Sequence, residues 1–404
     1  MIRKRSAFIG AVLLVLLTAF TTLVVSNIRA LQVGDHVIIS RQMYQQMQED
    51  TGGLYKLTSL KEFLLQEYYQ ELDEETLLDG AIRGMFEAVE DPYTTYLDAR
   101  DYSDLMMSTR GTYGGIGIIV TADEDGFVSV ISPIEGTPGE RAGLATGDRI
   151  LRVDDQSVSG NRLDDAVALM RGEPNTEVVL ELMKRNQRES TEVIIMRETI
   201  RIQSVRSEIM ENDIGYLRIS SFDEQTARDF QTHMDTLERS GVTQLILDLR
   251  NNPGGLLNQA NRIADLLLGE GLIVYTEDRH GNRREEMSDK KMYQMELVVL
   301  INEGSASASE ILAGAIQDHQ RGALVGTTSF GKGLVQELQQ LPDGTGFKYA
   351  VSQYFTPNGR YIHDTGIEPD VVVEIPEELL DEMHEVSEEN DLQLQKAIEL
   401  LQGS

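Results

Sequence analysis

The sequence contains no cysteine and is short of positive charge. Across 404 residues, 36 lysines and arginines stand against 67 acidic residues, giving a formal net charge of −31. The absence of cysteine excludes disulfides, thiol nucleophiles and cysteine-ligated zinc or iron–sulfur clusters. The negative charge argues against a nucleic-acid partner, because that binding depends on lysine and arginine neutralising phosphates. The length is enough for two to three domains.

One long segment near the start lacks charge altogether. Ser6–Ile28 has no charged side chain and follows Arg3-Lys4-Arg5. As a helix it is long enough to cross a hydrocarbon core of about 30 Å. We therefore expect residues 1–29 to be an uncleaved anchor in the cell membrane, with the basic cluster in the cytoplasm and the body outside. The alternative is a cleaved signal peptide that ends near Val24-Val25-Ser26 and leaves the body secreted.

The remainder divides into four stretches by pattern. Apolar residues at helical spacing predict a helical N-terminal region at 38–110. Short apolar runs separated by glycines predict a β-rich domain at 111–199, with one helix at Leu163–Arg171. Alternating strand and helix patterns at 200–373 predict parallel strands joined by crossover helices. Residues 374–404 form an acidic tail that we expect to be helical. The strands expected in the third stretch are Ile214–Ile219, Gln244–Leu249, Leu272–Tyr275, Leu297–Ile301 and Ala323–Gly326.

A glycine-rich segment opens the β-rich domain and reads Tyr113-Gly114-Gly115-Ile116-Gly117-Ile118. Such glycines most often serve a tight turn, but they also let backbone N–H groups converge on an anion beside a strand edge. With Pro138–Leu144 and Gly147–Val153, the stretch resembles a PDZ domain. The resemblance implies that Tyr113–Ile118 binds the end of a peptide. The Gly114–Gly117 loop would bind its free C-terminal carboxylate, and an apolar terminal side chain would lie in the groove.

Three alternate serines lie in Asn302–Glu310, between a predicted strand and a predicted helix. At such a junction, free N–H groups and the helix dipole stabilise developing negative charge, which suits a nucleophile. Ser307-Ala308-Ser309-Glu310 is equally a capping box, and taken alone the pattern favours that structural role.

No histidine lies in a recognisable triad motif, so lysine is the better candidate for a base. Lys332 lies between glycines in Phe330–Gln336, and burial would lower its pKa enough for general-base work. An exposed surface lysine is the alternative. The Pro-Gly-Gly turn after Leu245–Leu249 can present N–H groups to an oxyanion, while we expect Asp248 and Arg250 to form a structural ion pair.

Together these segments resemble the carboxy-terminal processing proteases, or tail-specific proteases, of peptidase family S41. The resemblance rests on segments in the family's order: Asp91–Leu97, Asp248–Gly255, Gly304–Glu310, Phe330–Gln336, Tyr354–Arg360 and Ile367–Asp370.

The resemblance implies a role for each matching residue. Ser307 would be the nucleophile, Lys332 the base and Gln336 its assistant, with no metal or other cofactor. The oxyanion hole would comprise Gly254 or Gly255 together with Ala308. Arg171, at the end of the PDZ helix, is either an exposed arginine or a link between peptide binding and the active site.

The implied fold is multidomain α/β. A ClpP/crotonase-like serine protease core would carry an inserted PDZ domain and helical N- and C-terminal regions, preceded by a transmembrane helix. The implied function is a homodimeric endopeptidase that cleaves extracytoplasmic proteins near their free, extended C-termini. A non-catalytic PDZ scaffold that only binds such termini is the alternative.

Overall fold

The computed structural model describes residues 14–18, 30–33, 36–39, 41–185, 187, 189–211, 213–376 and 390–403. It divides into two compact units, Met1–Glu90 and Asp91–Ser404. Within the described ranges, we find no helix with the length and apolar character needed to cross a bilayer. Apart from residues 14–18, the expected anchor at 1–29 lies outside the described residues and stays a prediction.

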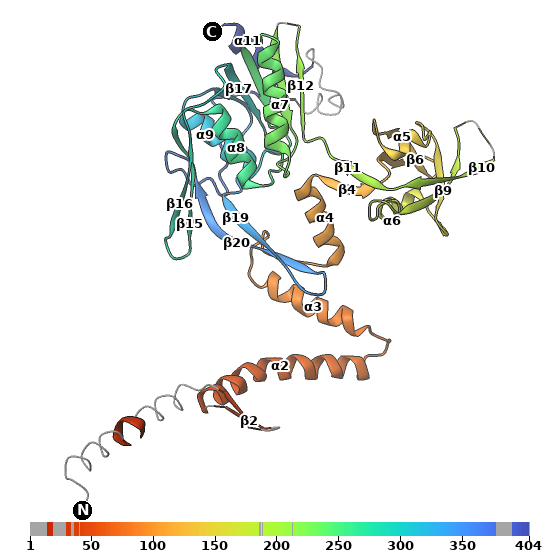
Figure 1. Ribbon diagram of the computed structural model, residues 1–404, viewed down its shortest axis with the longest axis vertical. Helices are drawn as coiled ribbons and strands as arrows, with labels where there is room; N and C mark the ends of the chain where they lie inside the picture. Colours follow the sequence, from red (N-terminus) through yellow and green to blue (C-terminus); the bar gives the residue numbers. More distant parts are fainter. Residues whose placement is uncertain are drawn as a thin grey trace, which may run out of the picture. The chain divides into compact units, whose positions relative to one another are not determined.

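The first unit is mainly helical. Strands β1 (Ala30–Val33) and β2 (His36–Ile39) pair antiparallel and precede the helices α2 (Arg41–Glu67) and α3 (Glu74–Glu87) (Figure 1). The side chain of Asp73 caps α3 by accepting the Thr76 N–H at 2.8 Å. The helical prediction at 38–110 is therefore confirmed for α2 and α3, but it missed the end of β2 and, in the second unit, the short strand Thr95–Leu97.

A six-stranded sheet forms the centre of the second unit, in the order β12-β13-β14-β17-β18-β21. All neighbours pair parallel except β12 and β13, which pair antiparallel. The strand bounds are Val205–Ile209, Ile214–Ile219, Gln244–Asp248, Glu296–Ile301, Ala323–Gly326 and Val371–Val372, in that order.

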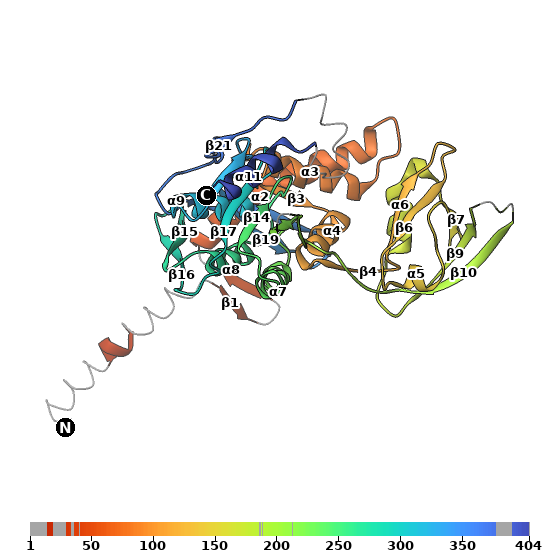
Figure 2. The ribbon, with the colours of Figure 1, turned by 90° about the horizontal axis from the view of Figure 1, so that it is seen from above.

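Helices cover both faces of this sheet, which explains why its inner strands β14, β17 and β18 are mainly apolar and buried. One face packs against α7 (Thr226–Arg239), α8 (Leu257–Leu267) and α9 (Ala308–Asp318). The other packs against α11 (Leu392–Gln402), through Leu394, Ala397 and Leu401. Figure 2 shows α11 in dark blue across β14 and β17 from α7 and α8. An α/β core is therefore confirmed, and its ClpP/crotonase character stays a prediction.

The strand predicted at Leu272–Tyr275 exists, but its expected parallel pairing is wrong. It is part of β15 (Gly271–Asp278), which lies in a separate antiparallel sheet ordered β16-β15-β20-β19. The side chain of Asp278 accepts the N–H groups of His280 and Asn282 in the turn that follows β15. A turn this short can only return the chain antiparallel. The other members are β16 (Arg283–Ser288), β19 (Leu334–Gln340), β20 (Gly346–Phe355) and, paired with β20, β3 (Thr95–Leu97).

The PDZ-like stretch forms a sheet of its own, ordered β10-β9-β7-β6-β5, with β8 paired to β7. The expected helix appears as α6 (Leu163–Met170). The first strand begins at Ile118 rather than Ile116, because Gly117 adopts a left-handed turn with φ of 71°. Two further strands pair antiparallel as a ribbon: β4 (Thr112–Gly115) precedes this sheet in the chain, and β11 (Glu198–Arg201) follows it. The sheet's strands and short helix are β5 (Ile118–Ala122), β6 (Val128–Pro133), α5 (Pro138–Arg141), β7 (Arg149–Val153), β8 (Gln156–Ser157), β9 (Glu177–Met183) and β10 (Ser190–Met196).

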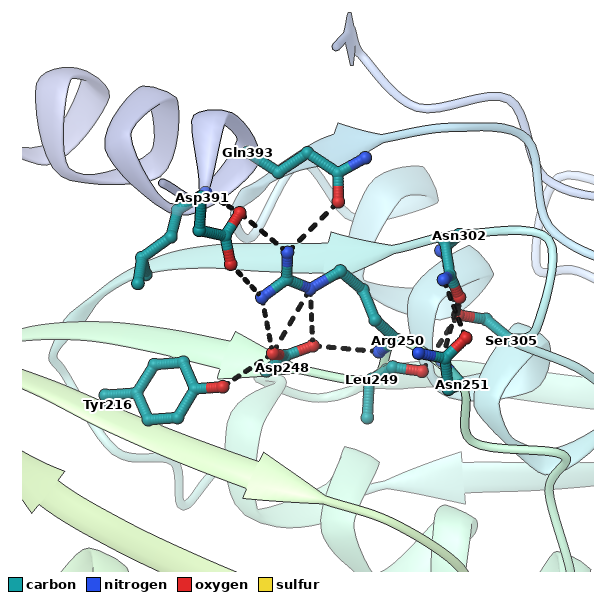
Figure 3. A network of polar contacts seen from close by, with 10 residues as sticks. Tyr216, Asp248, Leu249, Arg250, Asn251, Asn302, Ser305, Asp391 and Gln393 are labelled. Carbon is teal, nitrogen blue, oxygen red and sulfur yellow. Dashed lines mark hydrogen bonds and ion pairs between the residues drawn. The ribbon is translucent and has the colours of Figure 1, made fainter. Parts of the chain in front are cut away.

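A buried arginine joins α11 to the end of β14. Arg250 donates to Asp248 at 2.8 Å, to Asp391 at 2.9 Å and to Gln393 at 3.1 Å (Figure 3). The Tyr216 hydroxyl also donates to Asp248, at 2.6 Å. Burial alone would lower the pKa of Arg250, but the two carboxylates hold it above its usual value. The predicted structural ion pair is confirmed, and it extends to the C-terminal helix.

Arg250→Met should lower the free energy of unfolding by about 3–5 kcal/mol, because Asp248 and Asp391 would be left as buried carboxylates without a cation. Urea unfolding of the purified chain measures this. Arg239→Met on the exposed end of α7 is the control, expected within about 0.5 kcal/mol of the parent. A loss for Arg250→Met no larger than that of the control would contradict the interpretation.

Candidate active site

A cavity of about 1170 Å³ brings together the residues expected to carry the chemistry. Ser307, Lys332 and Gln336 line it. Gly254, Gly255 and Ala308 of the expected oxyanion hole line it as well. None of the histidines whose side chains the structure describes is among its lining residues.

Ser307 lies between β17 and α9 in a strained conformation, with φ of 54° and ψ of −112°. Its neighbours Ser305 and Ser309 are buried and donate to the carbonyl oxygens of Leu249 and Asn252 at 2.8 and 2.9 Å. Of the three alternate serines, only Ser307 lines the cavity. The side chains of the other two bind the two ends of the Leu249–Asn252 turn, which leads into the Pro-Gly-Gly segment.

The Lys332 amine is half-buried and hydrogen-bonded to Gln336. Its Nζ donates to Gln336 Oε1 at 2.6 Å, and the Gln336 amide nitrogen donates to the carbonyl oxygen of Tyr93. The Tyr93 ring lies over Nζ, 4.8 Å from the ring centre. Burial lowers the pKa of Lys332, and the neighbouring cation of Lys348 lowers it further, against opposing effects of Asp91 and Glu310. These surroundings favour the neutral amine, which is the form able to accept a proton.

Glu310 organises the site, a role that its place in the capping box did not reveal. Its carboxylate is fully buried and accepts the backbone N–H groups of Ser307 at 2.7 Å and Lys332 at 2.9 Å. It also accepts the Gly331 N–H at 2.7 Å and the Ser329 hydroxyl at 2.6 Å. One side chain therefore binds the backbone of both the serine and the lysine.

The Pro-Gly-Gly turn packs directly on the serine. Gly254 and Gly255 have φ of 101° and 139°, and a Cβ on Gly254 would lie 2.9 Å from Ser307 Cβ. The Gly254 N–H is already used, since it donates to Asn252 Oδ1 at 2.9 Å. The N–H groups of Gly255 and Ala308 have no partner among the described residues. This refines the expected hole, because Gly255 rather than Gly254 keeps a free donor.

The expected peptide-binding segment divides into two parts. Tyr113–Gly115 belongs to β4 and pairs with β11. In the turn that follows, the carbonyl oxygens of Ile116 and Gly117 accept the N–H groups of Gly139 and Ile134 at 2.7 and 2.9 Å. The N–H groups of these two turn residues have no partner within the described part of the chain. Ile116 and Gly117 directly precede β5, which is the edge strand of its sheet.

Arg171 is not simply an exposed side chain. It forms an ion pair with Asp104 at 3.1 Å, in helix α4 (Ala99–Arg110). Its guanidinium also lies over the Tyr113 ring, 5.4 Å from the ring centre. It therefore connects the end of α6 to residues outside the PDZ-like sheet.

Three protein-family models match parts of this chain. The family model "Peptidase family S41" matches residues 213–373, "PDZ domain" matches 129–183, and "Activating protease CtpB N-terminal domain" matches 18–101. The carboxy-terminal processing protease CtpA of Bacillus subtilis is 38% identical over 80% of this chain and 69% of its own length. The carboxyl-terminal-processing protease of Synechocystis is 39% identical over 80% of this chain and 76% of its own length.

A solved structure shares the fold at lower identity. The "Putative S41 protease from Bacteroides fragilis" is 15% identical with a TM-score of 0.51, over 83% of this chain and 91% of its own. The likeness concerns the fold alone. The curated relatives, together with the matched S41 and PDZ regions, establish the family. The chain belongs to the carboxy-terminal processing serine proteases of peptidase family S41.

Proposed function

We propose that Ser307 and Lys332 form the catalytic dyad of this protease, with Gln336 as the partner of the lysine. Neutral Lys332 takes the proton of Ser307 as its Oγ attacks the peptide carbonyl. The N–H groups of Gly255 and Ala308 stabilise the oxyanion. Lys332 then protonates the leaving amine, and water hydrolyses the acyl-enzyme. The observation that carries the proposal is the buried carboxylate of Glu310, which binds the backbone of Ser307 and Lys332 together.

The proposed substrates are proteins with free, extended C-termini. The N–H groups of Ile116 and Gly117, which have no partner among the residues that the structure describes, suit a terminal carboxylate. The β5 edge suits an added peptide strand. Partly buried apolar side chains of β5 and α6, among them Ile118 and Val167, suit an apolar terminal residue. A scaffold would need only these features. It would not need a half-buried lysine beside a strained serine, so we favour the protease.

We also propose that the protein acts outside the cytoplasm, held at the cell membrane by the uncharged segment Ser6–Ile28. Homodimer formation is part of the proposal. It is supported by exposed apolar side chains on the N-terminal helices, such as Phe63 on α2 and Met85 on α3. The acidic tail would reduce attraction to anionic lipids.

Ser307→Ala and Lys332→Ala should each abolish cleavage of an unstructured protein that ends in apolar residues, because one removes the nucleophile and the other the base. Gel electrophoresis and mass spectrometry of the products measure this for the full-length chain. Ser240→Ala, at an exposed helix end, is the matched control and should cleave like the parent. Cleavage that persists in either dyad variant would show that another group is the nucleophile or base.

The pH profile should report on Lys332. Activity requires the neutral amine, so kcat/KM should rise with pH and level off below the ordinary lysine pKa of 10.5. Lys348→Met removes a cation that lowers the pKa of Lys332, so the rising limb should move to higher pH. Lys291→Met, an exposed lysine that does not line the cavity, should leave the limb in place. A limb unmoved by Lys348→Met would contradict this assignment.

Carboxylate recognition is tested by comparing a peptide with a free C-terminus and its C-terminal amide. Loss of the charge should weaken binding to Ser307→Ala protein by about tenfold or more, as expected for a charge-assisted hydrogen bond of about 1.5–3 kcal/mol. Calorimetry or fluorescence anisotropy measures both affinities. Equal affinity for the two peptides would rule out carboxylate capture by the Ile116–Gly117 turn.

A further inference from the structure

The motif at Asp91–Leu97 has no role in the mechanism above, yet it reaches the lysine and its partner. Tyr93 accepts the amide N–H of Gln336 through its carbonyl oxygen, and its ring covers the Lys332 amine. The motif thus contacts both members of the Lys332–Gln336 pair through a single residue.

A compact turn holds the Tyr93 carbonyl in place. One carboxylate oxygen of Asp91 accepts the Tyr93 N–H at 2.9 Å, and the other accepts the Thr94 hydroxyl at 2.6 Å. The Asp91 carbonyl oxygen accepts the Thr94 N–H at 3.1 Å. The Thr94 hydroxyl in turn accepts the N–H of Ala350 at 3.2 Å. Ala350 is the register partner of Gln336 across β19 and β20, so the turn is tied to the strand directly opposite Gln336.

The chemistry of the carbonyl group fixes the orientation of the amide. A carbonyl oxygen can only accept a hydrogen bond, so the NH₂ end of Gln336 must face Tyr93. The oxygen end then faces Lys332 Nζ, as observed at 2.6 Å. In the flipped orientation the NH₂ group would donate to the lone pair of the neutral amine, and that lone pair would no longer be available to Ser307.

We propose that the Asp91–Thr94 turn is a positioning element that fixes the Gln336 amide so that only its oxygen faces Lys332. The inference rests on the proposed Ser307–Lys332 dyad and adds to it a structural reason for the role of Gln336. The turn residues act through Gln336 and do not contact the reacting atoms.

The ionisable groups that act on Lys332 come from several elements. Lys348 of β20 and burial favour the neutral amine, whereas Asp91 of the turn and Glu310 of α9 favour the ammonium. The Tyr93 ring covers the amine, and the Tyr354 hydroxyl lies 2.5 Å from the Lys332 carbonyl oxygen. Thr94 is uncharged, so replacing it changes the turn without changing any of these charges.

Thr94→Val is the main test, since it keeps the shape and removes the hydroxyl that binds Asp91 and Ala350. We expect kcat to fall by about tenfold at little change in KM, the size expected for one lost buried hydrogen bond. The rising limb of the pH profile should move lower by up to about one pH unit, because Gln336 would no longer stabilise the ammonium. Thr94→Ser keeps the hydroxyl and should behave like the parent. Thr95→Val, the same change one residue along, is the matched control.

Gln336→Glu gives a second test should Thr94→Val fail to fold. A carboxylate cannot donate to the Tyr93 carbonyl, and its charge raises the pKa of Lys332, so the limb should move to higher pH. If the hydrogen bond from residue 336 to the Tyr93 carbonyl is needed, kcat stays low even at pH values above the shifted rising limb. Full recovery there would show that only charge is involved, and would overturn the inference.

The outcomes separate the inference from the proposed function. Cleavage that survives Ser307→Ala overturns the dyad itself. Cleavage that requires Ser307 and Lys332 but is unchanged in Thr94→Val overturns only the positioning role. Equal losses in Thr94→Val, Thr94→Ser and Thr95→Val would show a general packing effect, and would overturn it as well.

Discussion

The buried carboxylate of Glu310 is the constraint on which the geometry of the site depends. A carboxylate without exposure is costly unless its oxygens are hydrogen-bonded, and here four donors satisfy them. Two of these donors are the backbone N–H groups of Ser307 and Lys332, which come from different loops. The loops therefore cannot separate without leaving a buried charge unsatisfied. Folding of the core, rather than arrival of a substrate, brings the backbones of these two residues together.

The same core keeps Ser307 in its strained backbone conformation. A non-glycine residue at positive φ costs of the order of 1–3 kcal/mol and persists only where its surroundings fix it. Ser305 and Ser309 fix the chain on either side of Ser307 by binding Leu249 and Asn252, at the two ends of a short turn. Arg250 lies in this turn and is bound to α11 (Figure 3). The C-terminal helix thus supports a site whose residues lie far from it in sequence.

Side-chain patterns predicted much of this from the sequence, and backbone contacts account for most of what they missed. The strands Ile214–Ile219 and Ala323–Gly326 match their predicted bounds, because strands covered on both faces form nearly continuous apolar runs. Leu272–Tyr275 looks the same in sequence, so its antiparallel sheet could not be distinguished by pattern. Glu310 was visible as a helix cap, but its bonds to Ser329, Gly331 and Lys332, which lie 19 to 22 residues further along the chain, were not. The carbonyl of Tyr93 carries no sequence signal at all.

The typical free energies of its contacts limit how strongly Arg171 can couple peptide binding to the active site. Coupling between sites is typically about 1–3 kcal/mol. The ion pair of Arg171 with Asp104 is solvent-exposed on both sides, and such pairs contribute about 0–1 kcal/mol. Its stacking on Tyr113 adds about 0.5–1 kcal/mol at an exposed site. Arg171 alone therefore supports coupling only at the lower end of that range. Stronger coupling would need further contacts. One such contact is at Gly111, directly before the β4–β11 ribbon, where a Cβ would lie 2.5 Å from the Asp223 carboxylate.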